Sequence, residues 1–163
     1  MTVNALILMG GNEAATPRLM ELATDQITRL AGKVSRQSAM YESTAWGFEA
    51  EHHFLNRVLE ISTGLKPVDL LHVLLNIEKD LGRTRIDPST YASRGIDIDI
   101  LFLDNLVIDT QELTVPHPRL HQRRFTLMPL NEQWPEWIHP TIGVTVNELL
   151  ARCSDKGFVK RVD

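Results

Sequence analysis

Apolar positions along this chain follow two periods, and together they predict the order of its elements. Residues 1–10 form a short, mostly apolar run, which predicts a first strand and is too short to span a membrane. From Thr16-Pro17 to Leu30, apolar residues recur at helical spacing. We expect a helix with Thr16 as its N-cap and with Gly32 ending it.

The next region predicts two strands and a second helix. Weak alternation covers residues 33–42 and clear alternation covers residues 54–63, with a long loop over residues 43–53 between them. Helical spacing then begins at Pro67, and we expect Gly82 to end that helix.

A strand over residues 95–103 completes the order β-α-β-β-α-β. This order predicts an α+β fold of the ferredoxin-like type, in which two right-handed crossovers place both helices on one face of a four-stranded antiparallel sheet.

The rest of the chain predicts a C-terminal elaboration of the same domain, which we expect to span residues 1–163. Asp104-Asn105 is a turn dipeptide, and residues 106–108 predict a short strand pairing back on its neighbour. Helical patterns cover residues 119–130 and 144–152, on either side of a proline-broken loop over residues 134–140.

Composition narrows the possible classes of protein. The net charge of −4 provides no global basic field for nucleic acid or an anionic membrane. Cys153, the single cysteine, allows no internal disulfide and matches no zinc spacing. With no basic leader at the start of the chain, these features predict a cytoplasmic protein with no nucleic-acid or membrane partner.

Two aspartates interrupt the apolar strand over residues 95–103. Because side chains alternate along a strand, Asp97 and Asp99 point to the same side, and their like charges need a positive partner. Carboxylate oxygens favour magnesium. A solvated strand face is the alternative interpretation.

Arginines precede this strand. Arg83 and Arg85 follow the expected second helix, where the helix dipole would also account for them, and Arg94 lies beside the carboxylates. Guanidinium groups bind phosphate oxygens well. The intervening residues 86–93 predict either a surface loop or a lid that closes over a charged ligand.

A third cluster covers residues 113–125, where His117 lies between two prolines and Arg123 adds positive charge. These side chains suit an anion, although a histidine often only satisfies a local hydrogen bond. Because the chain has no phosphate-binding P-loop motif, a nucleotide would be held by side chains.

Aromatic residues mark a possible acceptor pocket. The loop over residues 41–48 and the strand start at Phe54 supply rings that would enclose a flat heterocycle, and Asn56 would recognise its hydrogen-bonding edge. These rings would alternatively cap the core.

Four segments in this order resemble the 6-hydroxymethyl-7,8-dihydropterin pyrophosphokinase family of folate biosynthesis, over roughly four-fifths of the chain. The matching segments are Gly82-Arg83-x-Arg85, Arg94-x-Ile96-Asp97-Ile98-Asp99-Ile100-Leu101, Leu113-Thr114-Val115-Pro116-His117-Pro118 and Arg123-x-Phe125. The family transfers pyrophosphate from ATP to a pterin hydroxymethyl group and has the ferredoxin-like fold.

The resemblance implies a role for each candidate residue. Two Mg²⁺ ions would be held by Asp97 and Asp99, and the catalytic set would be completed by Arg83 and Arg94. ATP would be bound by Arg83, Arg85, Tyr91, Arg94, Ile100, Thr114, His117 and Arg123. The pterin would be bound by Ser43, Ala45, Trp46, Phe54, Asn56, Asp97 and Phe125. Glu78 would support the nearby arginines.

The chain departs from the family pattern near its start, in the lid and in the pterin loop, where Ser43-Thr44-Ala45-Trp46-Gly47 replaces a proline-rich version. Near the start, Met9-Gly10-Gly11-Asn12 replaces Leu-Gly-Ser-Asn, which we expect to change only a turn, and in the lid Tyr91 stands where some members carry tryptophan.

Two other functions fit parts of the pattern. An RNA-binding ferredoxin-like module would have exposed aromatics and basic charge, which the first strand and the net charge lack. A metal-dependent phosphohydrolase would use the same carboxylates and arginines, and only the heterocycle pocket argues against it. We expect a monomer that acts on small molecules.

Overall fold

The computed structural model describes residues 1–44, 53–83 and 95–163. Its first part contains β1 (Val3–Gly11), α1 (Thr16–Leu30), β2 (Lys33–Gln37), β3 (Tyr41–Ser43), β4 (Phe54–Thr63), α2 (Pro67–Arg83) and β5 (Asp97–Leu103). Then follow β6 (Ile108–Asp109), β7 (Thr114–Val115), the 3-10 turn η1 (Leu120–Gln122), α3 (Arg124–Gln133), α4 (Val146–Arg152) and β8 (Val159–Arg161).

The main sheet confirms the ferredoxin-like arrangement and is larger than expected. Its strand order is β5-β1-β4-β3-β8, with β2 also paired to β4, and every pairing is antiparallel. The prediction of four strands was wrong because the expected strand over residues 33–42 is two short strands, each pairing with a different part of β4. The sixth strand, β8, comes from the C-terminal segment.

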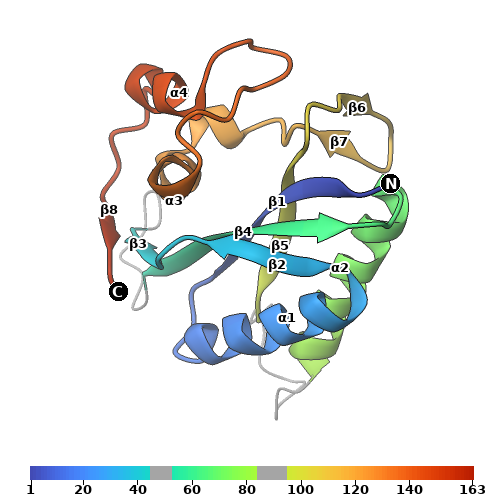
Figure 1. Ribbon diagram of the computed structural model, residues 1–163. Coiled ribbons are helices and arrows are strands. Elements are labelled where there is room, and N and C mark those ends of the chain that lie inside the picture. Colours follow the sequence, from blue (N-terminus) through green and yellow to red (C-terminus); the bar gives the residue numbers. More distant parts are fainter. Residues whose placement is uncertain (45–52, 84–94) are drawn as a thin grey trace.

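Helices cover both faces of this sheet (Figure 1). The expected pair, α1 and α2, packs on one face, where Ala5, Ile7 and Met9 of β1 join the core. On the other face α3 and α4 enclose a second core with Leu6 and Leu8. Alternation along β1 therefore serves two apolar layers, which explains why this strand has no polar face.

Several expected boundaries were wrong. Gly82 is the second-to-last residue of α2 rather than the residue that ends it, since a glycine does not by itself stop a helix. Thr16 is the first residue of α1 rather than its N-cap, and its hydroxyl accepts a hydrogen bond from Glu13 N at 2.9 Å. The strand expected over residues 106–108 is instead β6, which pairs with β7 and not with β5.

The C-terminal helices are shorter than their patterns predicted. The helical pattern over residues 119–130 divides into η1 and α3. The helix expected over residues 144–152 is α4, which begins at Val146, and the hydroxyl of the preceding Thr145 accepts a hydrogen bond from Glu148 N at 3.2 Å. No helix in the described ranges 1–44, 53–83 and 95–163 is long and apolar enough to cross a membrane.

A buried histidine makes this second layer sensitive to acid. His139 is 5% exposed, and its Nδ1 accepts hydrogen bonds from Thr141 N and Ile142 N at 3.2 and 3.0 Å. Its ring lies edge-on to Phe102, with centroids 5.7 Å apart. Burial, assisted by the neighbouring His121, lowers the pKa of His139 below its ordinary 6.5.

We expect acid to destabilise the fold through His139. Because the folded pKa is the lower one, the unfolded chain takes up the proton first, so stability is full above pH 6.5 and falls as the pH drops below it. Protonation of Nδ1 also removes both accepted hydrogen bonds, each worth roughly 1 kcal/mol. Urea unfolding between pH 7.5 and 5 should show this loss, and His139→Asn, which keeps an acceptor there, should flatten it. An equally steep profile in the variant would contradict the assignment.

Candidate active site

Three strands bring distant residues together at the centre of the sheet. Gly10 of β1 lies opposite Asn56 of β4 on one side and opposite Asp97 of β5 on the other. Two positions earlier, Leu8 lies opposite Asp99. The candidate acceptor amide and the two carboxylates therefore flank one strand, on the sheet face opposite α1 and α2.

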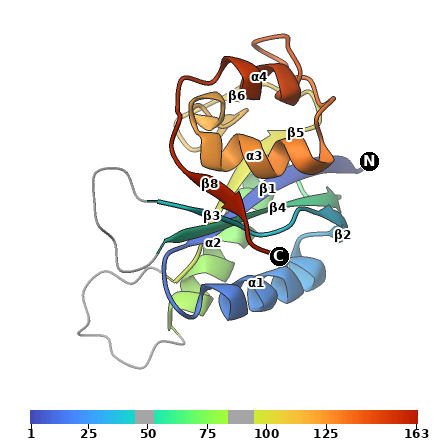
Figure 2. The ribbon, with the colours of Figure 1, turned by 90° about the vertical axis from the view of Figure 1, so that its left-hand side faces the viewer.

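These side chains border one cleft of about 250 Å³. Its lining residues from the first part of the chain are Leu8, Gly10, Ser43, Thr44, Phe54, Asn56, Asp97 and Asp99. The second layer adds Arg123, Phe125, Asp155, Gly157, Phe158 and Val159. Figure 2 shows α3 and α4 lying over the sheet on the side opposite α1, with the chain running from α4 to β8 at the edge of the sheet.

The two carboxylates begin an edge strand. Asp97 is exposed and Asp99 is half-buried, while the intervening Ile98 is buried in the core on the other face. Gly95, at a φ of 77°, turns the chain into this strand. The outward amide of Ile98 donates to the Glu78 carboxylate of α2 at 2.6 Å, which holds the strand between its two aspartates.

This contact is a hydrogen bond of Glu78 that the sequence did not predict, and the expected support of nearby arginines stays a prediction. The nearby arginines that it was expected to support lie outside the described residues, apart from Arg83 at the end of α2. Edge strands have unpaired amides, and a carboxylate from the packed helix satisfies this one. Glu78 therefore positions the metal-binding candidates through the backbone.

The aspartate pair suits a magnesium ion. Two carboxylates separated by one residue on the same strand face present hard oxygen ligands to the cleft. Across the described ranges no group of three His, Cys, Asp or Glu side chains gathers as a metal site. A pair leaves coordination positions for phosphate oxygens and water, which is how Mg²⁺ is commonly bound beside a nucleotide.

His117 lies in the electrostatic field of this pair. Burial lowers its pKa below 6.5, the negative charge of Asp99 opposes that shift, and Arg123 and Arg119 add to it. The ring is therefore neutral at neutral pH. Its Nδ1 accepts from Arg119 N at 3.1 Å, so the neutral ring carries its proton on Nε2 and can donate it to an anion.

Arg123 and Phe125 come from the start of α3. The Arg123 guanidinium lies 5.5 Å from the centre of the Phe125 ring, a cation-π arrangement that supports both side chains. Phe54, 36% exposed, borders the same cleft from β4. An aromatic ring is thus available on the sheet and another on the helical layer above it.

Gly10 has a role that the sequence did not indicate. A Cβ at this position would lie 2.3 Å from Asn56 Oδ1, so only glycine allows the buried amide to occupy its place. The expectation that Met9-Gly10-Gly11-Asn12 changes only a turn was wrong, because both glycines lie in β1. The sequence could not indicate this contact because Asn56, which pairs with Gly10, lies 46 positions further along the chain.

The remaining candidates are distributed as follows. Ser43 is buried in β3 and lines the cleft. Ile100 is buried with its side chain in the core toward α1 and α2, and Thr114 is exposed on β7, which contacts β5. The candidates outside the described residues are Ala45, Trp46, Arg85, Tyr91 and Arg94. Sequence reasoning missed the contribution of residues 155–159, for which no motif was available.

Comparison with known proteins finds a matching family model and similar relatives. The model of the 7,8-dihydro-6-hydroxymethylpterin-pyrophosphokinase (HPPK) family matches residues 6–135. A 2-amino-4-hydroxy-6-hydroxymethyldihydropteridine pyrophosphokinase of Porphyromonas gingivalis is 39% identical over 134 residues, covering 81% of this chain and 90% of that protein. The corresponding Aquifex aeolicus protein is 44% identical over 126 residues, covering 77% of this chain and 78% of its own length.

Solved structures support the fold. The wild-type HPPK-DHPS of Plasmodium falciparum with SDX-DHP superposes with a TM-score of 0.77 at 16% identity and covers 93% of this chain. This chain spans 44% of that longer one. The family match and the close relatives, together with a cleft that unites an aspartate pair with aromatic rings, show that the chain belongs to the 7,8-dihydro-6-hydroxymethylpterin-pyrophosphokinase family.

Proposed function

We propose that this protein transfers pyrophosphate from ATP to 6-hydroxymethyl-7,8-dihydropterin in the cleft bordered by Asp97, Asp99, Asn56 and Phe125. The pathway step is that of its family in folate synthesis. The single observation that carries the assignment to this cleft is the register of β1, which sets Asn56 and Asp97 on either side of Gly10.

The pterin is held by aromatic contact with its ring and by hydrogen bonds at its polar edge. Phe54 from β4 and Phe125 from α3 both contribute aromatic surface to the cleft, and Asn56 provides both a donor and an acceptor there. Asn56 is buried, so a hydrogen bond made there is shielded from water and leaves a costly unpaired amide when absent. This arrangement favours a flat heterocycle that has complementary polar groups on one edge.

The reaction needs alignment and charge neutralisation more than a strong base. The acceptor hydroxyl oxygen attacks the β-phosphorus and loses its proton to solvent, the bond from that phosphorus to the α–β bridging oxygen breaks, and AMP leaves. Arg123 supplies fixed positive charge at the cleft, and His117 donates from Nε2 while remaining neutral. Arg83 and Arg94 are proposed to add further positive charge at the phosphates.

Asp97 and Asp99 are proposed to hold two Mg²⁺ ions. When bound, these ions would neutralise phosphate charge and polarise the reacting oxygens. The two aspartates would orient them toward the acceptor hydroxyl, because both carboxylates open into the same cleft as Asn56. Arg85, Tyr91, Ile100 and Thr114 are proposed to complete the ATP site, and Ser43, Ala45 and Trp46 the pterin site.

The proposal extends to the state of the protein in the cell. We propose that it acts as a monomer, and that it acts in the cytoplasm because its single cysteine suits a reducing compartment.

Product analysis tests this function. The purified protein, incubated with ATP, Mg²⁺ and 6-hydroxymethyl-7,8-dihydropterin, is expected to form AMP and the pterin diphosphate in equal amounts, measured by chromatography and phosphorus NMR. Omission of the pterin should leave ATP intact. ADP or free phosphate as the main product, formed without pterin diphosphate, would instead indicate a phosphohydrolase and refute the proposal.

A further inference from the structure

The chain returns to the acceptor cleft after α4. Four residues of this return segment line the cleft: Asp155, Gly157, Phe158 and Val159. Figure 1 shows the segment passing α3 on its way to β8 at the edge of the sheet. It lies beyond residues 6–135, the part that matches the family model, so the family match assigns it no role.

The return segment is fixed at both ends. Before it, Cys153 is buried in the core beneath α3 and α4. After it, Val159 pairs with Ser43 of β3, so β8 extends the sheet at the cleft. Further along, Asp163 bonds Arg57 at 2.8 Å and Met40 N at 2.6 Å. These anchors make the segment a built part of the cleft wall.

Asp155 joins this wall to the helix that carries Phe125. One carboxylate oxygen accepts from Arg124 N, the first residue of α3, at 3.1 Å, and the other accepts from Gly157 N at 2.8 Å. The preceding residue of α3, Arg123, makes no side-chain cap. A carboxylate at a helix N-terminus is favourable because the helix dipole is positive there. Asp155 therefore fixes the return segment against the N-terminus of α3.

Phe158 is the apolar element of this wall. Phe158 is 52% exposed although it borders the cleft, and Phe54, which borders the same cleft, is 36% exposed. Exposed aromatic surface at the edge of a pocket gains free energy when a flat apolar ligand covers it. The two residues therefore offer apolar surface that an occupant of the cleft would bury.

We infer that residues 155–159 form the outer wall of the acceptor site, with Phe158 contacting the bound heterocycle and Asp155 as the positioning residue. This inference rests on the proposed function, because it takes the cleft occupant to be the pterin. It adds a substrate contact from a part of the chain outside the family match.

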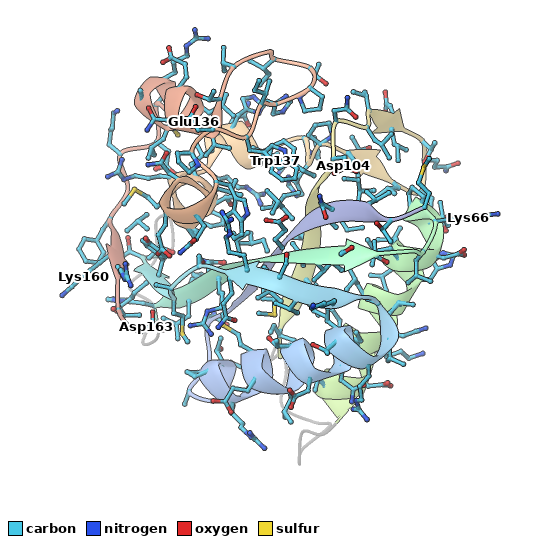
Figure 3. The ribbon with its side chains drawn as sticks, in the orientation of Figure 1. Lys66, Asp104, Glu136, Trp137, Lys160 and Asp163 are labelled. Atoms are coloured by element: carbon cyan, nitrogen blue, oxygen red, sulfur yellow. The ribbon has the colours of Figure 1, made fainter. Side chains whose placement is uncertain are left out.

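Substitution of Phe158 tests the contact. In the full-length protein, with a non-hydrolysable ATP analogue and Mg²⁺ present, Phe158→Ala is expected to weaken pterin binding about fivefold to twentyfold in calorimetry. Phe158→Leu should recover part of the affinity. The KM for ATP and the melting temperature should stay at wild-type values. Lys160→Ala is the matched control, since Lys160 is exposed on the neighbouring strand β8 (Figure 3).

Substitution of Asp155 tests the positioning role. Asp155→Ala should raise the KM for the pterin without raising that for ATP, and Asp155→Asn should have a smaller effect because its amide oxygen still accepts one of the two hydrogen bonds. Equal increases in both KM values, or no recovery by asparagine, would contradict this role.

The outcomes separate the inference from the function. If the wild-type protein binds the pterin and Phe158→Ala binds it within twofold of wild type, the inference about residues 155–159 is overturned and the proposed function stands. A wild-type protein that binds no pterin would overturn both.

Discussion

Replacing Asp97 or Asp99 by asparagine is expected to lower turnover by roughly 1,000-fold while the fold stays intact. Both carboxylates open into the cleft from one strand face, and asparagine keeps their size but not the charge that holds Mg²⁺. Each variant also removes one of two neighbouring like charges, so the melting temperature should be unchanged or higher. Steady-state formation of AMP and calorimetric thermal unfolding measure the two effects.

A remote aspartate provides the control for this prediction. Asp25 is exposed on α1, which covers the opposite face of the sheet, so Asp25→Asn should retain wild-type turnover. When turnover is measured against Mg²⁺ concentration, only the Asp97 and Asp99 variants should show a weakened response to Mg²⁺. An Asp97 or Asp99 variant that keeps turnover within tenfold of wild type would refute the metal-binding role of that residue.

Gly10→Ala is expected to raise the KM for the pterin by roughly 10-fold to 100-fold. The added methyl group would lie 2.3 Å from Asn56 Oδ1, so the buried amide has to leave the position from which it meets the acceptor. Overpacking of this kind also costs about 1 to 3 kcal/mol of stability. Steady-state kinetics at saturating ATP and chemical unfolding measure both consequences.

Two further variants isolate the cause. Gly64→Ala is the matched control because a Cβ there meets no atom within 4 Å. The double variant Gly10→Ala/Asn56→Ala should regain stability over the single Gly10→Ala variant, since the clashing amide is gone, yet it should not regain pterin affinity. If Gly10→Ala behaves as wild type in both measurements, Asn56 is not held against Gly10.

Periodicity was sufficient to predict the main elements but not all of their ends. The 3.6-residue and two-residue periods located α1, α2, β1, β4 and β5, and the ferredoxin-like order followed from them. Gly82 illustrates the failure: it was expected to end α2, yet it is the second-to-last residue of the helix, and helix ends are defined only to within one or two residues. Boundaries also depend on tertiary contacts, which local patterns do not contain.

The same distinction applies to the cleft. Alternation alone indicated that Asp97 and Asp99 share a face, because the period of a strand is a local property of the backbone. The chemistry of Arg123, His117 and Phe125 was likewise recognisable from their motifs. Their position relative to Asn56 was not recognisable, because it depends on which strand lies between these residues in the sheet.

By itself, then, the sequence determined the element order, the shared face of the two aspartates and the family that the chain resembles. Only the tertiary structure decided that Gly10 makes room for Asn56 beside Asp97, and that the segment around Asp155 and Phe158 lines the same cleft. The physical reason is that sheet register and layer packing are set by contacts between residues far apart in the chain, whereas a motif records only neighbours.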